Sequence, residues 1–352
     1  MPSVIPSPLL LLGDIGGTHL SLALGHLGSR GLEVRFQQGR SSRDASNLIH
    51  PVRAFLAEAR AQGVEAPPAA ACFAGAGPVR GGRIQLTNLP WSLDQAELAA
   101  ELGVPVAVIN DGSALVQAVL RLDPTKDPRV AAVPVAEGPL PAPAPGGLAL
   151  VVGAGTGLGV GFGFLERDRA WVFPSEGGHL GLPIFDEASA ALHAHLARTC
   201  PGPPGAELVV SGPGLARLLA FESTRGPLTP AASAILGLPE AERPKAIVAQ
   251  ATTDPACAGV VDRFIATYAR VCADLVSAFL PVGGLYLAGG VTARLAASLL
   301  GSPRFREAFT RNYRPHLDQL TAGTPVYLLR DYALSLEGAA WAARDLLRED
   351  AS

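Results

Sequence analysis

Two glycine-rich turns, each flanked by short apolar runs, constrain the fold of this chain more than any other feature. The first lies in residues 9–24, with the sequence LLLLGDIGGTHLSLAL, and the second in residues 148–162, with the sequence LALVVGAGTGLGVGF. In each copy an apolar run of period two follows the glycines and a threonine, which predicts strand, tight turn and strand. Glycines permit positive φ and leave backbone N–H groups uncovered, so such a turn can approach an anion closely. The repeat predicts two related α/β units that could face a polyphosphate from both sides.

Neither turn matches the common nucleotide-binding loops. A Walker A loop needs Gly-Lys-Ser/Thr, and a protein kinase needs a lysine on its third strand. The chain contains only Lys126 and Lys245, and neither adjoins a glycine turn. A dinucleotide-binding GxGxxG register that starts at Gly153 places Leu158 where the third glycine belongs. These three classes of site are therefore excluded.

Composition limits the class of protein. With 352 residues, the chain can form two domains of ordinary size, and 48% hydrophobic against 17% charged residues argues against disorder. The net charge of −3, without a basic stripe, argues against a nucleic-acid partner. No apolar run reaches the roughly 20 residues of a membrane-spanning helix, so no membrane partner is expected. The 4 cysteines show no CxxC spacing, which is typical of reduced thiols in a cytoplasmic protein and not of a metal site.

Alternating strand and helix patterns predict mixed sheets with helices packed on them. After the hairpin at residues 9–24, the first half is expected to contain strands at Leu32–Gln38, Ala69–Ala74 and Val104–Ile109 and helices at Leu48–Gln62, Leu93–Leu102 and from Ala114. The second half is expected to contain strands at Leu208–Val210, Leu285–Ala288 and Pro325–Arg330 and helices at Glu187–Ala197, Gly214–Glu222, Pro244–Ala251 and Val260–Phe279. Residues 123–147, rich in Pro, Ala and Gly, are expected to form a surface excursion or linker. The last helix, Leu334–Leu347, is expected to pack back on the N-terminal unit.

Polar or glycine-rich clusters stand at the ends of four predicted strands. They are Gly13–Thr18, Asn110-Asp111, Gly153–Gly159 and Gly289-Gly290. Ligands in open α/β sheets bind at the carboxyl ends of strands. We therefore expect ligand-binding residues among these clusters.

Asp111 has two interpretations. It follows an apolar strand, where a carboxylate is costly unless it is solvated or hydrogen-bonded, and it could accept the proton of a substrate hydroxyl that attacks phosphorus. The structural alternative is that residues 110–113 form a turn and N-cap for a helix that begins at Ala114. The residues alone leave both open.

Asp14, within the first glycine segment, is equally ambiguous. Its carboxylate could hold a Mg²⁺-bound water beside the phosphates, because hard oxygen ligands suit Mg²⁺ and this ion keeps much of its water. The alternative is an Asx-turn that only shapes the hairpin.

A second set of polar side chains could bind a sugar. Glu176 and His179 lie around two glycines, and Glu207 precedes a predicted strand; together they offer acceptors for several hydroxyl groups. The alternative is that the histidine is a structural hydrogen-bonding group and that Glu207 is solvated. His193 and His195 lie two apart on a predicted helix and share no face, so they are a poor metal pair.

The order of these motifs resembles that of bacterial glucokinases, which belong to the actin/hexokinase/Hsp70 superfamily of ATPases. The matching segments run from about residue 9 to the C-terminus. They are GDIGGT at 13–18, LTNLPW at 86–91, IND at 109–111, GAGTGLG at 153–159, EGGH at 176–179, ELVVSGPG at 207–214, LAGG at 287–290 and LEGAA at 336–340.

The resemblance implies an α/β fold of two RNase H-like, actin-like ATPase domains, with mixed sheets flanked by helices and the active site in the interdomain cleft. The small domain would comprise residues 1–110 and about 334–352, and the large domain residues 111–333. The implied general base on the sugar 6-hydroxyl is Asp111. The implied substrate-binding residues are Asn110, Asp111, Glu176, His179 and Glu207. The implied ATP-binding residues are Gly13, Asp14, Ile15, Gly16, Gly17, Thr18, Gly155, Thr156, Gly157, Gly289 and Gly290.

The implied activity is phosphorylation of glucose to glucose 6-phosphate with ATP and Mg²⁺, in the cytoplasm and by a chain expected to form a homodimer. Asp14 would hold Mg²⁺ through water. The nearest alternative is a kinase for mannose, fructose or an N-acetyl amino sugar, and a non-catalytic sugar sensor is the alternative from another class. The chain departs from the family pattern beside the site at His19, Gly112 and Leu180-Gly181, which bears on sugar preference and loop rigidity.

Overall fold

The computed structural model describes residues 7–28, 31–87, 89–331 and 333–349, so Asn88 of the matched segment 86–91 lies outside the described residues. The chain forms two compact units. The first comprises the described parts of Met1–Leu122, Leu165–Pro174 and Ala333–Ser352, and the second those of Asp123–Phe164 and Ser175–Tyr332. The functional domain boundaries stated above, at residues 110, 111, 333 and 334, remain a prediction.

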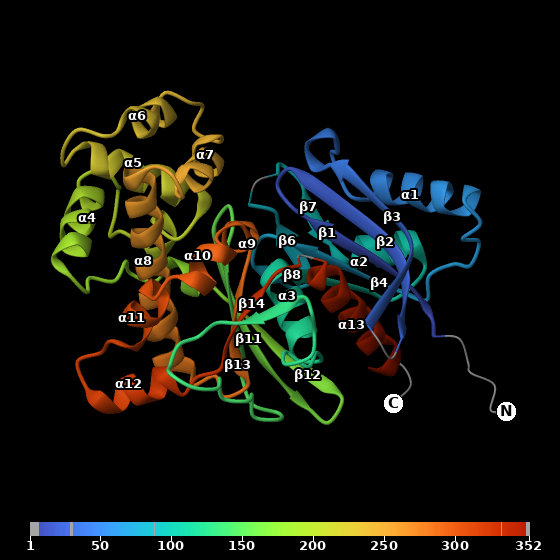
Figure 1. The fold of residues 1–352 in the computed structure, drawn as a ribbon. Helices are drawn as coiled ribbons and strands as arrows, with labels where there is room; N and C mark the ends of the chain where they lie inside the picture. The colour runs from blue at the N-terminus through green and yellow to red at the C-terminus, as the bar shows by residue number, and fades with distance from the viewer. Residues whose placement is uncertain (1–6, 29–30, 88, 332, 350–352) are drawn as a thin grey trace. The chain divides into compact units, whose positions relative to one another are not determined.

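The first unit contains a five-stranded mixed sheet in the order β3-β2-β1-β4-β8 (Figure 1). Its strands are β1 (Leu9–Ile15), β2 (His19–Gly28), β3 (Gly31–Ser41), β4 (Ala70–Gly75) and β8 (Val106–Asn110). Strand β2 pairs antiparallel with β1 and β3, and β4 pairs parallel with β1 and β8. The helices of this unit are α1 (Ile49–Ala61), α2 (Gln95–Leu102), α3 (Asp111–Val119) and α13 (Leu334–Glu349). The predicted α/β class, with mixed sheets flanked by helices, is confirmed.

The continuous leucine run of β1 is explained by burial on both faces of the sheet. Leu9 and Leu11 pack in one core cluster with α1 and α2, whereas Leu10 and Leu12 pack in another with α13. Because successive side chains of a strand point to opposite faces, a strand covered on both sides reads as an uninterrupted apolar run.

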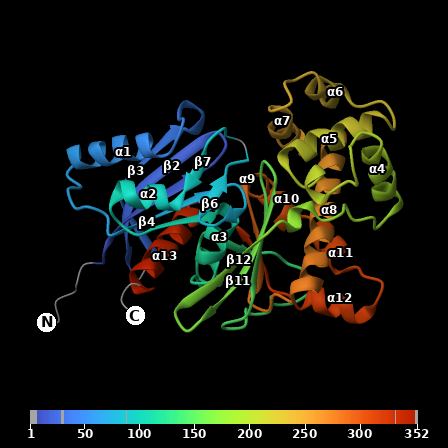
Figure 2. The same ribbon diagram turned by 180° about the vertical axis from the view of Figure 1, so that it is seen from behind.

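Helix α13 packs on this sheet and against α3, as predicted for the last helix (Figure 2). The two helices meet closely at Gly338, where a Cβ atom would overlap the carbonyl oxygen of Ala114. This approach brings the C-terminal helix against the helix that begins at Asp111.

The second unit is built on a six-stranded sheet in the order β12-β11-β10-β13-β14-β9. Its strands are β9 (Val130–Ala132), β10 (Ala149–Ala154), β11 (Leu158–Glu166), β12 (Arg169–Ser175), β13 (Gly284–Ala288) and β14 (Val326–Leu329); the outer end of the β11–β12 hairpin falls in the first unit. The helices are α4 (Glu187–Ala197), α5 (Gly212–Ser223), α6 (Pro230–Leu236), α7 (Arg243–Gln250), α8 (Pro255–Phe279), α9 (Gly290–Arg294), α10 (Ala296–Gly301), α11 (Arg304–Thr310) and α12 (Pro315–Ala322). The long helix α8 is joined to the sheet by Tyr268, whose buried hydroxyl donates to the Val152 carbonyl at 2.6 Å.

Three local predictions were wrong. Leu208–Val210 is not a strand: a 3-10 helix covers Ala206–Leu208, and Val209 and Val210 are buried in a core cluster shared with α5. The helix expected from Ala114 begins at Asp111, because Asn110 provides the cap. The expected linker 123–147 contains β9, which pairs antiparallel with β14.

A small sheet in the first unit was not predicted. It consists of β5 (Val79–Arg80), β6 (Arg83–Gln85) and β7 (Ser92–Asp94). Consequently α2 begins at Gln95, where Asp94 caps it by accepting from the backbone N–H groups of Ala96 and Glu97.

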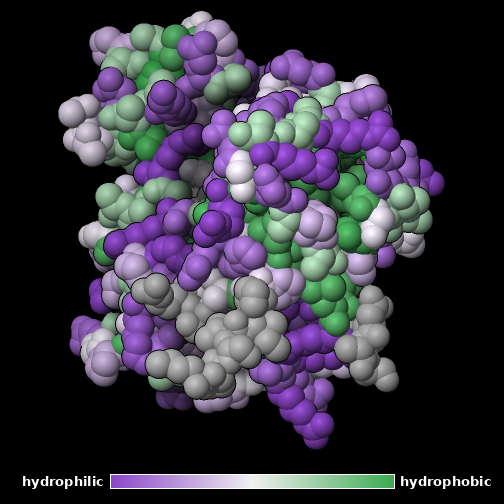
Figure 3. Space-filling view, turned by 90° about the vertical axis from the view of Figure 1, so that its right-hand side faces the viewer, coloured by the Kyte–Doolittle hydropathy of each residue, from purple (hydrophilic) through white to green (hydrophobic). Residues whose placement is uncertain are grey.

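Figure 3 shows one face of the molecule, where hydrophilic residues are mixed with smaller hydrophobic areas. Within the part of the chain that the structure describes, no helix is both long enough and apolar enough to cross a membrane.

Candidate active site

The first group of predicted site residues lies at one edge of the first sheet. The parallel strands are in register so that Ile15 pairs with Gly75 and Gly75 pairs with Asn110, at the carboxyl ends of β1, β4 and β8. Topology therefore brings the glycine turn and the Asn110-Asp111 pair to a common edge, where open α/β sheets bind ligands. Gly13, Asp14 and Ile15 lie within β1, so the turn itself is shorter than its motif. Gly16, Gly17 and Thr18 form it, and the Gly16 N–H donates to the His19 carbonyl at 2.9 Å.

Asp14 is held by a residue from the other end of the chain. The buried Ser335, in the first turn of α13, donates its hydroxyl to Asp14 Oδ2 at 2.6 Å. Burial raises the pKa of Asp14, and the hydrogen bond from Ser335 and the charge of His19 partly oppose this shift. Because Asp14 pairs with Ser21 and Ala74 inside a sheet, its carboxylate does not form the Asx-turn considered above.

Asn110, and not Asp111, caps helix α3, which distinguishes the two interpretations of Asp111. The Asn110 side chain accepts from the backbone N–H groups of Gly112 and Ser113, at 2.9 and 3.4 Å, and donates to the Gly77 carbonyl at 3.0 Å. The N-cap position is thus occupied by Asn110, whereas Asp111 is the first residue of the helix.

Asp111 lies where a helix stabilises negative charge. Its Oδ1 accepts from the Gly112 N–H at 2.8 Å, and carboxylates in the first turn interact favourably with the helix dipole. Strand β4 lies between β1, which contains Asp14, and β8, which ends directly before Asp111. Two strand spacings place the backbones of Asp14 and Asp111 on the order of 10 Å apart, which is within the length of a triphosphate and its acceptor.

The second glycine turn, in the second unit, joins β10 to β11. The Gly155 N–H donates to the Gly157 carbonyl at 2.8 Å and closes the turn around Thr156. A Cβ on Gly157 would overlap Glu207 Oε2, whereas a Cβ on Gly155 would meet no atom within 4 Å. Glu207 therefore packs against the turn at Gly157, whereas the space next to Gly155 is open.

Gly289 and Gly290 lie beside this turn. Strand β13 pairs parallel with β10, with Ala288 opposite Gly153. Gly289 has φ 97°, and a Cβ there would overlap the Ala154 carbonyl oxygen, so only glycine fits without strain. A Cβ on Gly290 would meet open space. The structure thus brings together the second turn and the Gly289-Gly290 pair.

Glu176, His179 and Glu207 also come together in the second unit. Glu176 precedes a 3-10 helix at Gly177–His179, and His179 Nε2 lies 3.5 Å from Glu176 Oε2. Their side chains are 61% exposed for His179 and 66% exposed for Glu176. The loop after His179 and the loop before Glu207 are joined by two backbone hydrogen bonds of 2.8 Å each. Leu182 N donates to Pro204 O, and Ala206 N donates to Leu180 O.

Glu207 makes a contact that sequence reasoning did not find. Its Oε2 accepts from the backbone N–H of Leu158 at 2.8 Å, at the end of the second glycine turn. Ser335 was likewise missed. No sequence signal could have indicated either contact, because the partners are 49 and 321 residues apart.

Among the described residues, no group of three or more His, Cys, Asp or Glu side chains is arranged to hold a metal ion. Asp14 nevertheless fits Mg²⁺ held through water. Oδ1, the oxygen that Ser335 does not use, has no hydrogen-bond partner within residues 7–28, 31–87, 89–331 and 333–349. A carboxylate oxygen is the hard ligand that this ion prefers.

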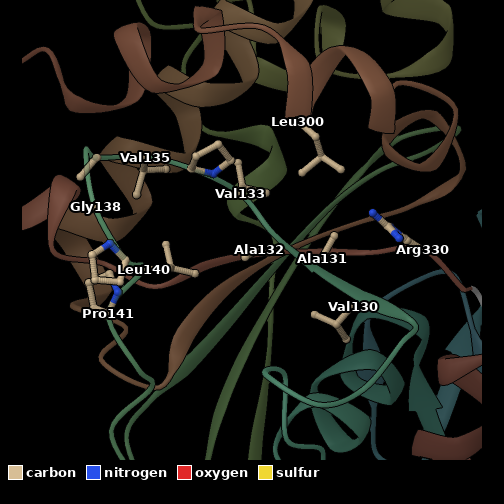
Figure 4. Close-up of a pocket in the computed structure, with 13 residues that line it drawn as sticks. Val130, Ala131, Ala132, Val133, Val135, Gly138, Leu140, Pro141, Leu300 and Arg330 are labelled. Carbon is tan, nitrogen blue, oxygen red and sulfur yellow. The ribbon is translucent and has the colours of Figure 1, made fainter.

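A pocket of about 590 Å³ lies elsewhere, at the β9 edge of the second sheet (Figure 4). Val130–Ala136, Gly138–Pro141, Leu300 and Arg330 line it. Among the described residues that line it, Arg330 alone is charged, and none is a predicted site residue. This pocket lacks the carboxylates that the predicted chemistry needs, so it is not the candidate site.

Comparison with known proteins agrees with the motif order. The sequence model of the family described as Glucokinase matches residues 11–346. A glucokinase of Nostoc punctiforme is 33% identical over 357 residues, covering 96% of this chain and 99% of that protein.

Solved structures show the same fold. A glucokinase from an Antarctic psychrotroph matches with a TM-score of 0.76 and 26% identity, covering 96% of this chain and 99% of that one. A ROK family glucokinase from Streptomyces griseus, solved in complex with glucose and AMPPNP, matches with a TM-score of 0.64 and 21% identity, covering 96% and 99% of the two chains. Sequence and fold agree over nearly the whole length, and this chain belongs to the glucokinase family.

Proposed function

We propose that this chain phosphorylates glucose at its 6-hydroxyl with ATP as the donor, with Asp111 as the general base. The family match over residues 11–346 supports the glucokinase activity. The observation that supports the role of Asp111 is its place at the start of α3, with the capping hydrogen bonds supplied by Asn110.

In the proposed reaction the Asp111 carboxylate accepts the proton of the 6-hydroxyl as its oxygen attacks the γ-phosphorus of ATP. The new bond joins the sugar oxygen to phosphorus, the bond from phosphorus to the bridging oxygen breaks, and ADP leaves with the electron pair. Asn110, Glu176, His179 and Glu207 are proposed to bind the other hydroxyl groups, because oxygen acceptors and amide or imidazole donors can position a polyol in one orientation.

The open space over Gly155 and Gly290 supports a phosphate and nucleoside site there, since backbone without side chains permits close approach. Asp14 is proposed to hold Mg²⁺ through water. When bound, Mg²⁺ supplies positive charge to the phosphate oxygens. The homodimer and the cytoplasmic location implied by the resemblance belong to the same proposal.

The test of the proposed base is Asp111→Asn, assayed by coupled detection of ADP and by glucose binding. We expect kcat to fall by about 10²–10⁴-fold, the range for loss of a general base, while the glucose Kd changes little. The matched control is Asp262→Asn, which alters an exposed aspartate on α8 and should leave turnover unchanged. Turnover of Asp111→Asn within about tenfold of wild type would exclude Asp111 as the base.

Kinases for other hexoses are the competing proposal, because Leu180, directly after His179, is 54% exposed and departs from the family pattern. A panel of glucose, mannose, fructose and N-acetylglucosamine, compared by kcat/KM, separates these substrates. We expect glucose to have the highest value; a higher value for another sugar would replace it in the proposal.

A further inference from the structure

Leu158 is contacted by both elements that carry the proposed sugar-binding residues. Its backbone N–H donates to Glu207 Oε2 at 2.8 Å. Its carbonyl group lies so close to Gly178 that a Cβ there would overlap the oxygen atom. Since Gly178 lies between Glu176 and His179, the first residue of β11 is held between the two parts of the sugar site.

The same carboxylate supports the preceding residue of the turn. Glu207 Oε2 occupies the place that a Cβ of Gly157 would take, and the Gly157 carbonyl accepts from Gly155. The position of Glu207 therefore limits where Gly157 and the end of the second glycine turn can lie.

Hydrogen bonds connect the backbone of Glu207 to the other half of the turn. The Glu207 carbonyl accepts from Ser211 Oγ at 2.7 Å, and the next residue, Gly212, donates its N–H to the Gly155 carbonyl at 2.8 Å. Together with the bonds from Gly155 to Gly157 and from Leu158 to Glu207, these contacts close a ring around the turn. Glu207 takes part in this ring through both its side chain and its backbone.

We propose that Glu207 is a positioning residue that couples sugar binding to the shape of the second glycine turn, and so to ATP binding. The inference rests on the proposed function. Oε2 is engaged by Leu158, and Oε1 has no hydrogen-bond partner in the described part of the chain, which leaves it for a sugar hydroxyl. A hydroxyl on Oε1 restricts rotation of the carboxylate, and the restricted carboxylate holds the turn in the conformation that receives phosphate.

Coupling of this kind is reciprocal: glucose raises the affinity for nucleotide by the same factor as nucleotide raises the affinity for glucose. We expect a factor of about 5–150 in the wild type, the usual range for coupled sites. Among the described residues, the exposed Glu176 side chain makes no hydrogen bond to the turn, so its contribution should be confined to glucose binding.

The experiment measures the Kd of a non-hydrolysable ATP analogue by calorimetry, without glucose and at saturating glucose, in the full chain. Glu207→Gln preserves the shape of the side chain but removes its charge, and we expect its coupling factor to fall to about 1. Glu176→Gln is the matched control, since it also removes a sugar-binding carboxylate. It should weaken glucose binding and keep the wild-type coupling factor.

A second variant, Gly178→Ala, acts on the Leu158 carbonyl and removes no polar group from the protein. Its Cβ displaces the Leu158 carbonyl, so the analogue should bind more weakly in the presence of glucose, with a smaller coupling factor than in the wild type. Wild-type coupling in both Glu207→Gln and Gly178→Ala would overturn the inference and leave the proposed function standing. Absence of glucose phosphorylation by the wild type would overturn the proposed function and the inference with it.

Discussion

Replacement of Asp14 by asparagine should make the first unit more stable while it abolishes activity. Burial raises the pKa of Asp14, so its site in the folded protein disfavours the ionised form of this carboxyl group. An amide is neutral and retains an oxygen that can accept the 2.6 Å hydrogen bond from Ser335. The variant therefore cannot ionise, and it keeps this contact.

The size of the effect follows from the linkage between pKa and stability. Each unit by which folding raises a pKa corresponds to about 1.4 kcal/mol, and an unsatisfied buried polar group costs about 1–3 kcal/mol. We expect Asp14→Asn to raise the free energy of unfolding by about 1–3 kcal/mol at pH 7.5. For a unit of this size, the midpoint of thermal unfolding should rise by roughly 2–4 °C per kcal/mol.

The pH dependence has a definite sign. A carboxyl group whose pKa is raised on folding contributes stability that is present below the pKa of the unfolded chain, 3.8, and is lost as pH rises through the higher pKa of the folded protein. The stability difference between variant and wild type should therefore be small near pH 4 and grow toward neutral pH.

Urea unfolding followed by tryptophan fluorescence measures this difference. The 3 tryptophans, Trp91, Trp171 and Trp341, all lie in the first unit, so the signal reports on the unit that contains Asp14. A chelator keeps divalent ions from Asp14, and Asp262→Asn serves as an exposed control. A variant that is less stable than wild type at pH 7.5, or a difference that does not grow with pH, would refute the reasoning.

Two further predictions concern glycines and thiols. Gly155→Ala should raise the KM for ATP without changing the midpoint of thermal unfolding, since its Cβ meets open space. Gly289→Ala should destabilise the protein by more than about 2 kcal/mol, because Gly289 has φ 97° and a Cβ there meets the Ala154 carbonyl. Equal effects of the two alanines on thermal unfolding would contradict this. Burial raises the pKa of Cys72, so iodoacetamide should alkylate the partly exposed Cys200 first in the folded protein; peptide mass spectrometry would reveal the opposite order.

Local sequence patterns predicted the structure correctly where it depends on residues that are neighbours in sequence. The hairpins β1–β2 and β10–β11 are confirmed, because apolar alternation on both sides of glycines specifies strand, turn and strand over a short stretch. An N-cap within residues 110–113 was one of two open interpretations of Asp111, and its assignment to Asn110 required the backbone geometry of α3.

Local patterns failed where burial came from distant elements. Leu208–Val210 is apolar like a strand, but Val209 and Val210 are buried against helices, and periodicity cannot distinguish these cases over three residues. Strand β9 is short and lies in a proline-rich segment, and it exists because β14 offers an edge for it to pair with.

The sequence by itself determined the mixed α/β class, the two glycine turns, the family and the set of candidate residues, because each depends on motifs read along the chain. Only the tertiary structure decided how those residues are held. Ser335 reaches Asp14 across 321 residues, and Glu207 reaches Leu158 across 49. The physical reason is that a hydrogen bond depends on distance in space, and strand order and helix packing set that distance. Thus the two glycine turns could be found in the sequence, but the side chains that support them could be found only in the fold.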